Sequence, residues 1–123
     1  MVWKKLNVNP SNRTTNDDAI KALSVALNKQ WKDIYIFVAK YALGQRLSMD
    51  DKRAIKGVLR VLGYTEIRLD KQCNVEQFIR LYAERGKTYI LQLGSNFTVI
   101  KNEVLIESYD ARKKMVSSYW KIC

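Results

Sequence analysis

The residues best suited to nucleophilic chemistry in this sequence are its two cysteines, Cys73 and Cys123. A cysteine nucleophile needs a neighbouring base, normally an imidazole, and the sequence contains no histidine. This composition excludes Ser-His-Asp and Cys-His catalysis and any histidine-bound metal. Two cysteines are also too few for a structural zinc site. We therefore expect reduced thiols and no cofactor or metal.

Asp17 and Asp18 form the acidic pair most open to a catalytic interpretation. An aspartate nucleophile or an acid–base pair is chemically conceivable for them. However, adjacent helical residues point about 100° apart, which places two carboxylates poorly for joint action. They follow Asn16, a good N-cap residue, and acidic groups in a first turn stabilise a helix by ~0.3–1 kcal/mol each. We interpret them as residues that start a helix, and keep an enzyme with reassigned residues as the third hypothesis.

The charge of the chain points to anionic partners. Its 22 Lys and Arg residues against 12 Asp and Glu give a net charge of +10. A basic stripe with a spacing of four residues and a second cluster further along the chain contain the candidate partner-binding residues, which are Lys52, Arg53, Lys56, Arg60, Arg112, Lys113 and Lys114. Such groups form either a solvated surface or a site for phosphates or for an acidic or nucleoprotein partner. We expect Lys52, Lys56 and Arg60 to be exposed together.

Periodicity predicts the elements that carry these residues. Apolar spacing predicts helices over 17–28, 31–43 and 75–85, and a third helix capped by Ser48 and ended by Gly63. Alternation predicts strands over 64–69, 88–93, 97–100, 104–109 and 115–122, with a turn at Lys101-Asn102. Helices followed by strands indicate one α+β domain, residues 1–123, in which N-terminal helices pack on a C-terminal antiparallel sheet. No apolar run reaches the ~18 residues of a membrane span.

Packing is the simplest interpretation of the aromatic residues. In the second helix the predicted buried stripe is Trp31, Ile34, Tyr35, Val38 and Ala42. We also assign Tyr89, Tyr119 and Trp120 to the core. Trp3 is expected to pack against the domain, with Gly44 ending the second helix.

Several segments in the right order resemble small papain-like cysteine peptidase domains, which are common in phages and prophages of low-GC Gram-positive bacteria. The segments are residues 14–23, 26–28, 31–35, 74–78, 88–91, 108–110 and 118–120. The resemblance covers about residues 1–122 and implies a papain-like fold. It also implies a cytoplasmic location in a bacterial host cell.

The same resemblance implies that catalysis has been lost. The family needs a thiolate at the start of the first helix, an imidazole on a strand and a group that orients the imidazole. The nucleophile position matches Asp18, and the histidine position matches Asn96. The third position matches Glu107 or Asp110. We expect Asp18 and Asn96 to face one another within hydrogen-bond or one-water distance.

The leading hypothesis is therefore a catalytically inactive phage or prophage protein that binds a protein or nucleoprotein partner. A host-defence inhibitor such as an anti-CRISPR protein is its most concrete form. The alternative is a module that binds nucleic-acid backbones without sequence specificity through the basic helix face. The binding surface is either this face or the vestigial cleft at Asp18 and Asn96.

Overall fold

A computed structural model describes residues 2–5, 18–107 and 110–123. The helices are α1 (Asp18–Leu27), α2 (Trp31–Gly44), α3 (Lys52–Val61) and α4 (Val75–Leu81). The strands are β1 (Val2–Lys5), β2 (Ile67–Arg68), β3 (Thr88–Leu93), β4 (Asn96–Lys101), β5 (Val104–Glu107) and β6 (Ser118–Lys121). The three larger helices precede every strand but β1, which confirms the α+β class.

The strands form one sheet with the order β1-β5-β4-β3-β6-β2. The pairs from β5 to β2 are all antiparallel, as predicted. Strand β1, which the sequence pattern did not indicate, adds to the edge of the sheet in parallel with β5. Because this pairing joins segments about 100 residues apart, no local sequence pattern predicts it. Its partners run from Val2 opposite Val104 to Lys5 opposite Glu107.

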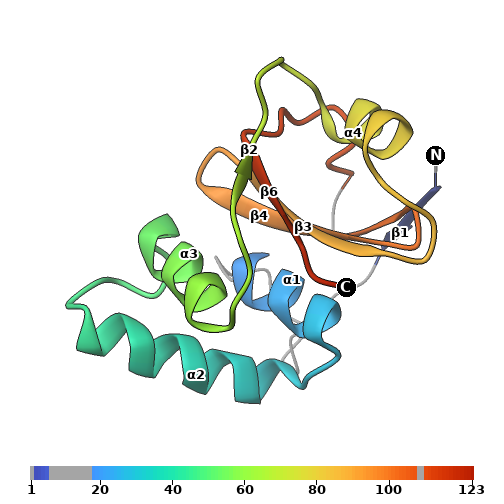
Figure 1. Cartoon of the computed structure of the whole chain (residues 1–123). Coiled ribbons are helices and arrows are strands. Elements are labelled where there is room, and N and C mark those ends of the chain that lie inside the picture. The colour runs from blue at the N-terminus through green and yellow to red at the C-terminus, as the bar shows by residue number, and fades with distance from the viewer. Residues whose placement is uncertain (1, 6–17, 108–109) are drawn as a thin grey trace.

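The two faces of the sheet carry separate cores. Helices α1, α2 and α3 cover one face and α4 covers the other (Figure 1). Alternation along β3 divides the side chains, since Ile90 packs with the three-helix layer and Leu91 packs on the α4 side. Trp120 of β6 is paired with Ile90 and belongs to the three-helix core. Side chains on α3 and on the loop beside α4 therefore emerge on opposite sides of the sheet.

Helix α2 departs from the predicted buried stripe. Ile34, Val38 and Ala42 are buried as expected, but Tyr35 is exposed and stacks on Trp31 with ring centroids 5.0 Å apart. The buried face of the helix is therefore narrower than the sequence suggested. The outward residues of α2 include large apolar side chains that the sequence analysis did not single out.

Close contact between α2 and α3 depends on Gly57. A methyl group built on Gly57 would overlap the ring end of Tyr41, reaching 2.5 Å from its Cε1 atom. Glycine at this position therefore leaves room for the Tyr41 side chain of α2 against α3. This contact fixes the position of α3, which carries most of the candidate binding residues.

Several predicted boundaries need correction. Helix α3 begins after Asp51 rather than after Ser48, because the Asp51 side chain accepts the Arg53 N–H that an N-cap must satisfy. Helix α2 continues through Gly44, and Arg46 takes the left-handed conformation instead (φ 58°). The hairpin turn lies at Asn102 and Glu103, one residue later than predicted.

Other boundaries are shorter than the patterns suggested. The strand expected over 64–69 is reduced to β2, the strand over 115–122 to β6, and the helix over 75–85 to α4. The capping box of α4 is confirmed, since Asn74 and Gln77 exchange hydrogen bonds of 2.8 Å. The side chain of Trp3, the cap at Asn16 and Asp17, and Ser108 and Tyr109 lie outside what the structure describes. Among the described residues no helix is long and apolar enough to cross a membrane.

Candidate functional site

Helix α3 presents its basic residues on a firmly capped helix. The Asp51 carboxylate accepts hydrogen bonds from the Arg53 backbone at 2.9 Å and from Arg53 Nη2 at 2.7 Å. These contacts hold the pKa of Asp51 at about 2. Asp51 therefore stays charged at neutral pH and binds the Arg53 side chain over the first turn of α3.

Lys56 is not the free surface cation that the stripe predicted. The chain that leaves α3 turns back toward the helix and places Glu66 Oε2 3.0 Å from Lys56 Nζ. The Lys56 side chain is only 24% exposed, whereas Lys52 and Arg60 are exposed. The prediction that all three would be exposed together is therefore wrong for Lys56, because of an ion pair between residues ten positions apart.

Glu66 is held from several directions. Partial burial alone would raise the pKa of its carboxyl group, but hydrogen bonds from Ser118 and Lys56 outweigh this effect and lower it. Arg68 Nε lies 3.9 Å from the same oxygen atom that Lys56 contacts. Glu66 thus remains ionised and ties the segment after α3 to both the helix and β6.

A cleft of about 420 Å³ opens between α3 and this segment. Its lining, which defines the α3 cleft, is Arg53, Lys56, Arg60, Tyr64, Thr65, Glu66 and Trp120. Three cations face one carboxylate, so the lining is net positive. Arg60 makes no ion pair with any described residue, which leaves its guanidinium available. Trp120 is 1% exposed and therefore shapes the cleft wall without offering a ring face for stacking.

The second basic cluster lies in the loop before β6, on the α4 side of the sheet. Arg112 donates to Asp110 through Nε at 2.8 Å and Nη2 at 2.6 Å, and Lys113 Nζ lies 3.8 Å from Glu76. Lys114 is exposed, and its carbonyl accepts the Val75 N–H at the start of α4. Two of these three cations are therefore in ion pairs. The loop also stabilises the start of α4 through the Lys114 carbonyl.

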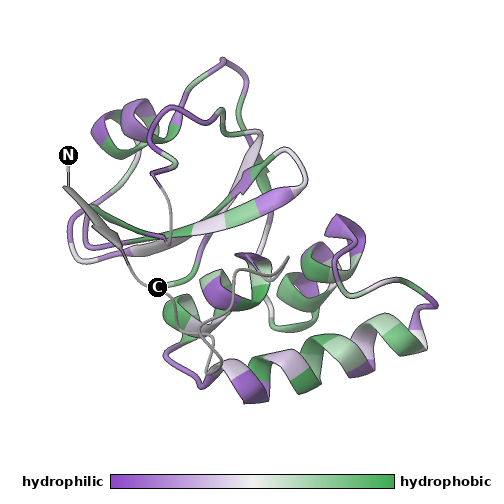
Figure 2. Ribbon diagram, turned by 180° about the vertical axis from the view of Figure 1, so that it is seen from behind, coloured by the Kyte–Doolittle hydropathy of each residue, from purple (hydrophilic) through white to green (hydrophobic). Residues whose placement is uncertain are grey.

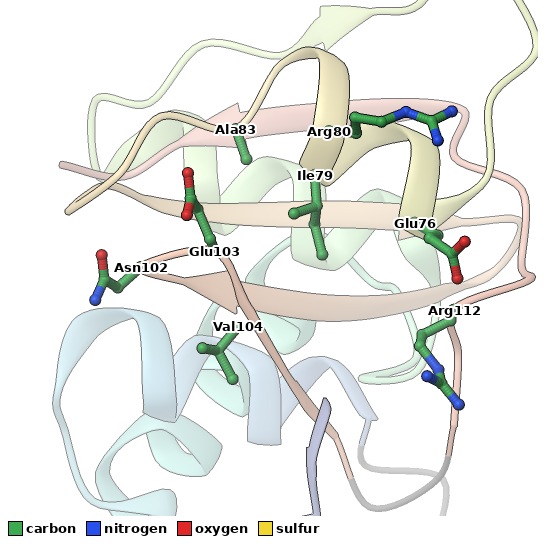
Figure 3. A pocket seen from close by; sticks show the side chains of 8 residues that line it. All are labelled: Glu76, Ile79, Arg80, Ala83, Asn102, Glu103, Val104 and Arg112. Carbon is green, nitrogen blue, oxygen red and sulfur yellow. The ribbon is translucent and has the colours of Figure 1, made fainter. Parts of the chain in front are cut away.

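Beside this loop is a larger cleft of about 600 Å³, shown in Figure 3. Ile79 of α4 and Ala83, just after the helix, point toward the strands, while Asn102 and Glu103 come from the β4–β5 turn (Figure 3). The charges around this α4 cleft balance, since Arg80 and Arg112 oppose Glu76 and Glu103. The sheet separates it from the α3 cleft, so the two predicted basic clusters do not form one surface.

Asp18 and Asn96, which the resemblance aligns with a nucleophile and a histidine, lie on elements in contact. Asp18 is the first residue of α1, and its Oδ1 atom lies 3.7 Å from Lys21 Nζ. Asn96 is the first residue of β4 and is exposed. Helix α1 packs directly against β4. The close approach of the Asp18 and Asn96 side chains stays a prediction.

The two candidates for the third position have different surroundings. Glu107 is buried at the end of β5, opposite Lys5 of β1. Asp110 is exposed, and the hydrogen bonds from the Arg112 guanidinium hold the pKa of its carboxyl below the usual value. A carboxylate engaged in this way is a structural anchor for the loop before β6.

The two thiols have different surroundings. Both cysteines are free; Cys73 is buried, which raises the pKa of its thiol, and Cys123 is exposed. Within the ranges that the structure describes, no three Cys, Asp or Glu side chains are arranged to hold a metal ion.

One part of the candidate site was not predicted from the sequence. Tyr64, Thr65 and Glu66 enter the α3 cleft from a segment predicted as the start of a strand. The only signal that could have indicated this segment is the glycine at position 63, whose φ of 94° turns the chain back.

Comparisons of this chain with protein-family models, with curated proteins and with solved structures find no match.

Proposed function

We propose that this protein is a catalytically inactive binding protein that engages an acidic protein or nucleoprotein partner through the α3 cleft. The observation that carries this proposal is the net positive lining of the cleft together with the guanidinium of Arg60, which makes no ion pair within the described part of the chain. The charges that line the α4 cleft balance, so this cleft attracts an anion less strongly than the α3 cleft does. The net charge of +10 adds a long-range attraction that speeds encounter with such a partner.

Arginine suits this task because its planar guanidinium donates two parallel hydrogen bonds to a carboxylate or phosphate. Arg53 is partly committed to Asp51, and Lys56 is committed to Glu66. Arg60 can therefore accept a partner's anion without losing an internal ion pair. A partner group that reached deeper would have to compete with Glu66 for Lys56, which favours ligands that carry more than one negative charge.

The resemblance to papain-like domains of phages and prophages supports the non-catalytic part of the proposal, because Asp18 and Asn96 stand where that family needs cysteine and histidine. A host-defence inhibitor that acts on a nucleoprotein effector, as an anti-CRISPR protein does, fits both this origin and the charge. Such a protein works in the cytoplasm of the host cell. Hydrolysis of a peptide substrate that disappears in Asp18→Ala would contradict this assignment and favour an enzyme.

The test compares two charge reversals of equal size on opposite sides of the sheet. Arg60→Glu changes the α3 cleft, and Lys114→Glu is the matched control in the loop beside α4. Both side chains are exposed, so each change should alter stability by no more than about 0.5 kcal/mol. Replacement of Lys56 is avoided because it would remove the ion-pair partner of Glu66.

Immobilised protein is used to capture partners from a bacterial lysate, with and without nuclease. The wild type and Lys114→Glu should retain a nuclease-resistant partner that Arg60→Glu loses. Equal behaviour of the two variants would refute the role of the α3 cleft. Retention of nuclease-sensitive material only, with naked DNA binding that falls steeply with salt, would establish the nucleic-acid alternative instead. In that case each phosphate contact removed should lower the salt slope by about one.

A further inference from the structure

Helix α2 is apolar on the side that faces away from the rest of the molecule. It lies at the outer limit of the helical layer in both views (Figures 1 and 2). Ile36 and Phe37 are each 42% exposed, and Leu43 is 80% exposed. The opposite side of the helix is fully occupied with the core through Ile34 and Val38. A helix that is apolar on both sides is typical of one buried between two layers, and the residues that the structure describes supply only one of these layers.

The outward residues form a continuous face. Asp33, Ile36, Phe37, Lys40 and Leu43 follow the spacing of three, four and seven residues that places side chains on one side of a helix. We call these five residues the α2 outer face. Exposed apolar side chains grouped between charged ones are typical of protein–protein interfaces.

The charges on this face indicate what covers it. Asp33 and Lys40 are both exposed, and neither makes an ion pair with a described residue. They are seven residues apart, or about 10.5 Å along the helix, which is too far for them to pair with one another. Asp33 and Lys40 also lie at equal distances from the midpoint between Ile36 and Phe37.

The α2 outer face can pair with the same face of a second copy of the chain. If two α2 helices pack antiparallel about a two-fold axis at that midpoint, Asp33 of one copy lies opposite Lys40 of the other. Ile36 of one copy then lies opposite Phe37 of the other. The Asp33–Lys40 and Ile36–Phe37 contacts each occur twice, as a two-fold interface requires. We propose that the α2 outer face is the interface of a homodimer.

The dimer is expected to be weak and dependent on concentration. One helix pair buries less area than the interfaces of stable complexes. The charge of +10 on each copy opposes association, and salt at about 0.15 M confines this repulsion to about 8 Å. The wild type should therefore shift from monomer to dimer as its concentration rises at physiological salt.

The test is a charge exchange measured by sedimentation equilibrium. In Asp33→Lys the two copies place lysine opposite Lys40, and in Lys40→Asp they place aspartate opposite Asp33, so each variant alone should be monomeric. In an equimolar mixture of the two variants, each introduced charge lies opposite the introduced charge of the other sign, so the two variants should form a heterodimer. Lys71→Asp is the matched control, since it makes the same charge change at an exposed lysine outside α2 and should still dimerise.

A second variant tests the apolar part of the interface. Phe37→Ser should weaken the dimer by about tenfold or more, because Phe37 of each copy faces Ile36 of the other at the centre of the interface. Far-UV circular dichroism checks that each variant keeps its helices. The proposal is overturned if the wild type stays monomeric at the highest concentration reached, or if Asp33→Lys and Lys40→Asp dimerise as well alone as when mixed. These readouts do not depend on the α3 cleft, so they are independent of the proposed function.

Discussion

The contact of Gly57 with Tyr41 makes a quantitative prediction about Gly57→Ala. An alanine inside α3 should add about 1 kcal/mol of helix stability relative to glycine. The new methyl group would overlap the end of the Tyr41 ring, however, and overpacking of this kind costs about 1–3 kcal/mol. The variant should therefore lose about 1 kcal/mol of unfolding free energy. For a domain of this size the melting temperature should fall by about 3–5 °C.

Urea denaturation followed by tryptophan fluorescence measures these free energies. In a Tyr41→Leu background the overlap is gone, so Gly57→Ala should now stabilise the protein by about 0.5–1 kcal/mol. Gly44→Ala is the matched control, because nothing lies within 4 Å of a methyl group there and the change should be neutral or favourable. The reasoning is refuted if Gly57→Ala stabilises the wild type as much as it stabilises the Tyr41→Leu protein.

Two further predictions concern the α3 cap and the β4–β5 turn. The pKa of Asp51 is lowered from 3.8 to about 2 on folding, so its contribution to stability is complete above about pH 4 and is lost as the pH falls toward 2. Acid unfolding followed by circular dichroism should show this loss in the wild type, and Asp51→Asn, which keeps the capping acceptor without a charge, should show a shallower decline. Glu103→Gly should raise the unfolding free energy by about 1 kcal/mol in urea titrations, because Glu103 has a φ of 65° in a two-residue turn where glycine is favoured. An unchanged or lower value would argue against strain at this position.

The features that the sequence predicted are those encoded locally. The β3 and β4 strands follow from alternating β-branched and aromatic residues on either side of Gly94, which has a φ of 69°. The start of α4 follows from a capping pattern that spans only Asn74 to Gln77. In each case the residues that decide the structure are neighbours in the chain, so their physical preferences can be recognised without knowledge of the fold.

The features that it missed depend on contacts between distant residues. Nothing near Lys56 indicates that Glu66 will return to neutralise it, and nothing near Val2 indicates a strand that pairs with β5. The choice of Asp51 over Ser48 as the cap is similar, since both residue types cap helices and packing of α3 decides between them. The α3 cleft combines such contacts, which is why only its helical half could be predicted.

The unequal depth of the strands around the α3 cleft has a consequence for how it meets a partner. Trp120 sits in β6, which pairs directly with the wholly buried β3, and amides of such strands exchange with solvent only when most of the domain opens. The segment through Tyr64 leads instead into β2, an edge strand of two exposed residues. Besides the contacts of Glu66, this side is held by the hydrogen bond from the Tyr64 N–H to the Leu59 carbonyl and by the short pairing of β2 with β6. These contacts are fewer than those of β6 with β3, so brief local openings can reshape this side more readily than the base. The cleft thus combines a rigid base with a rim that can adapt to the shape of its partner.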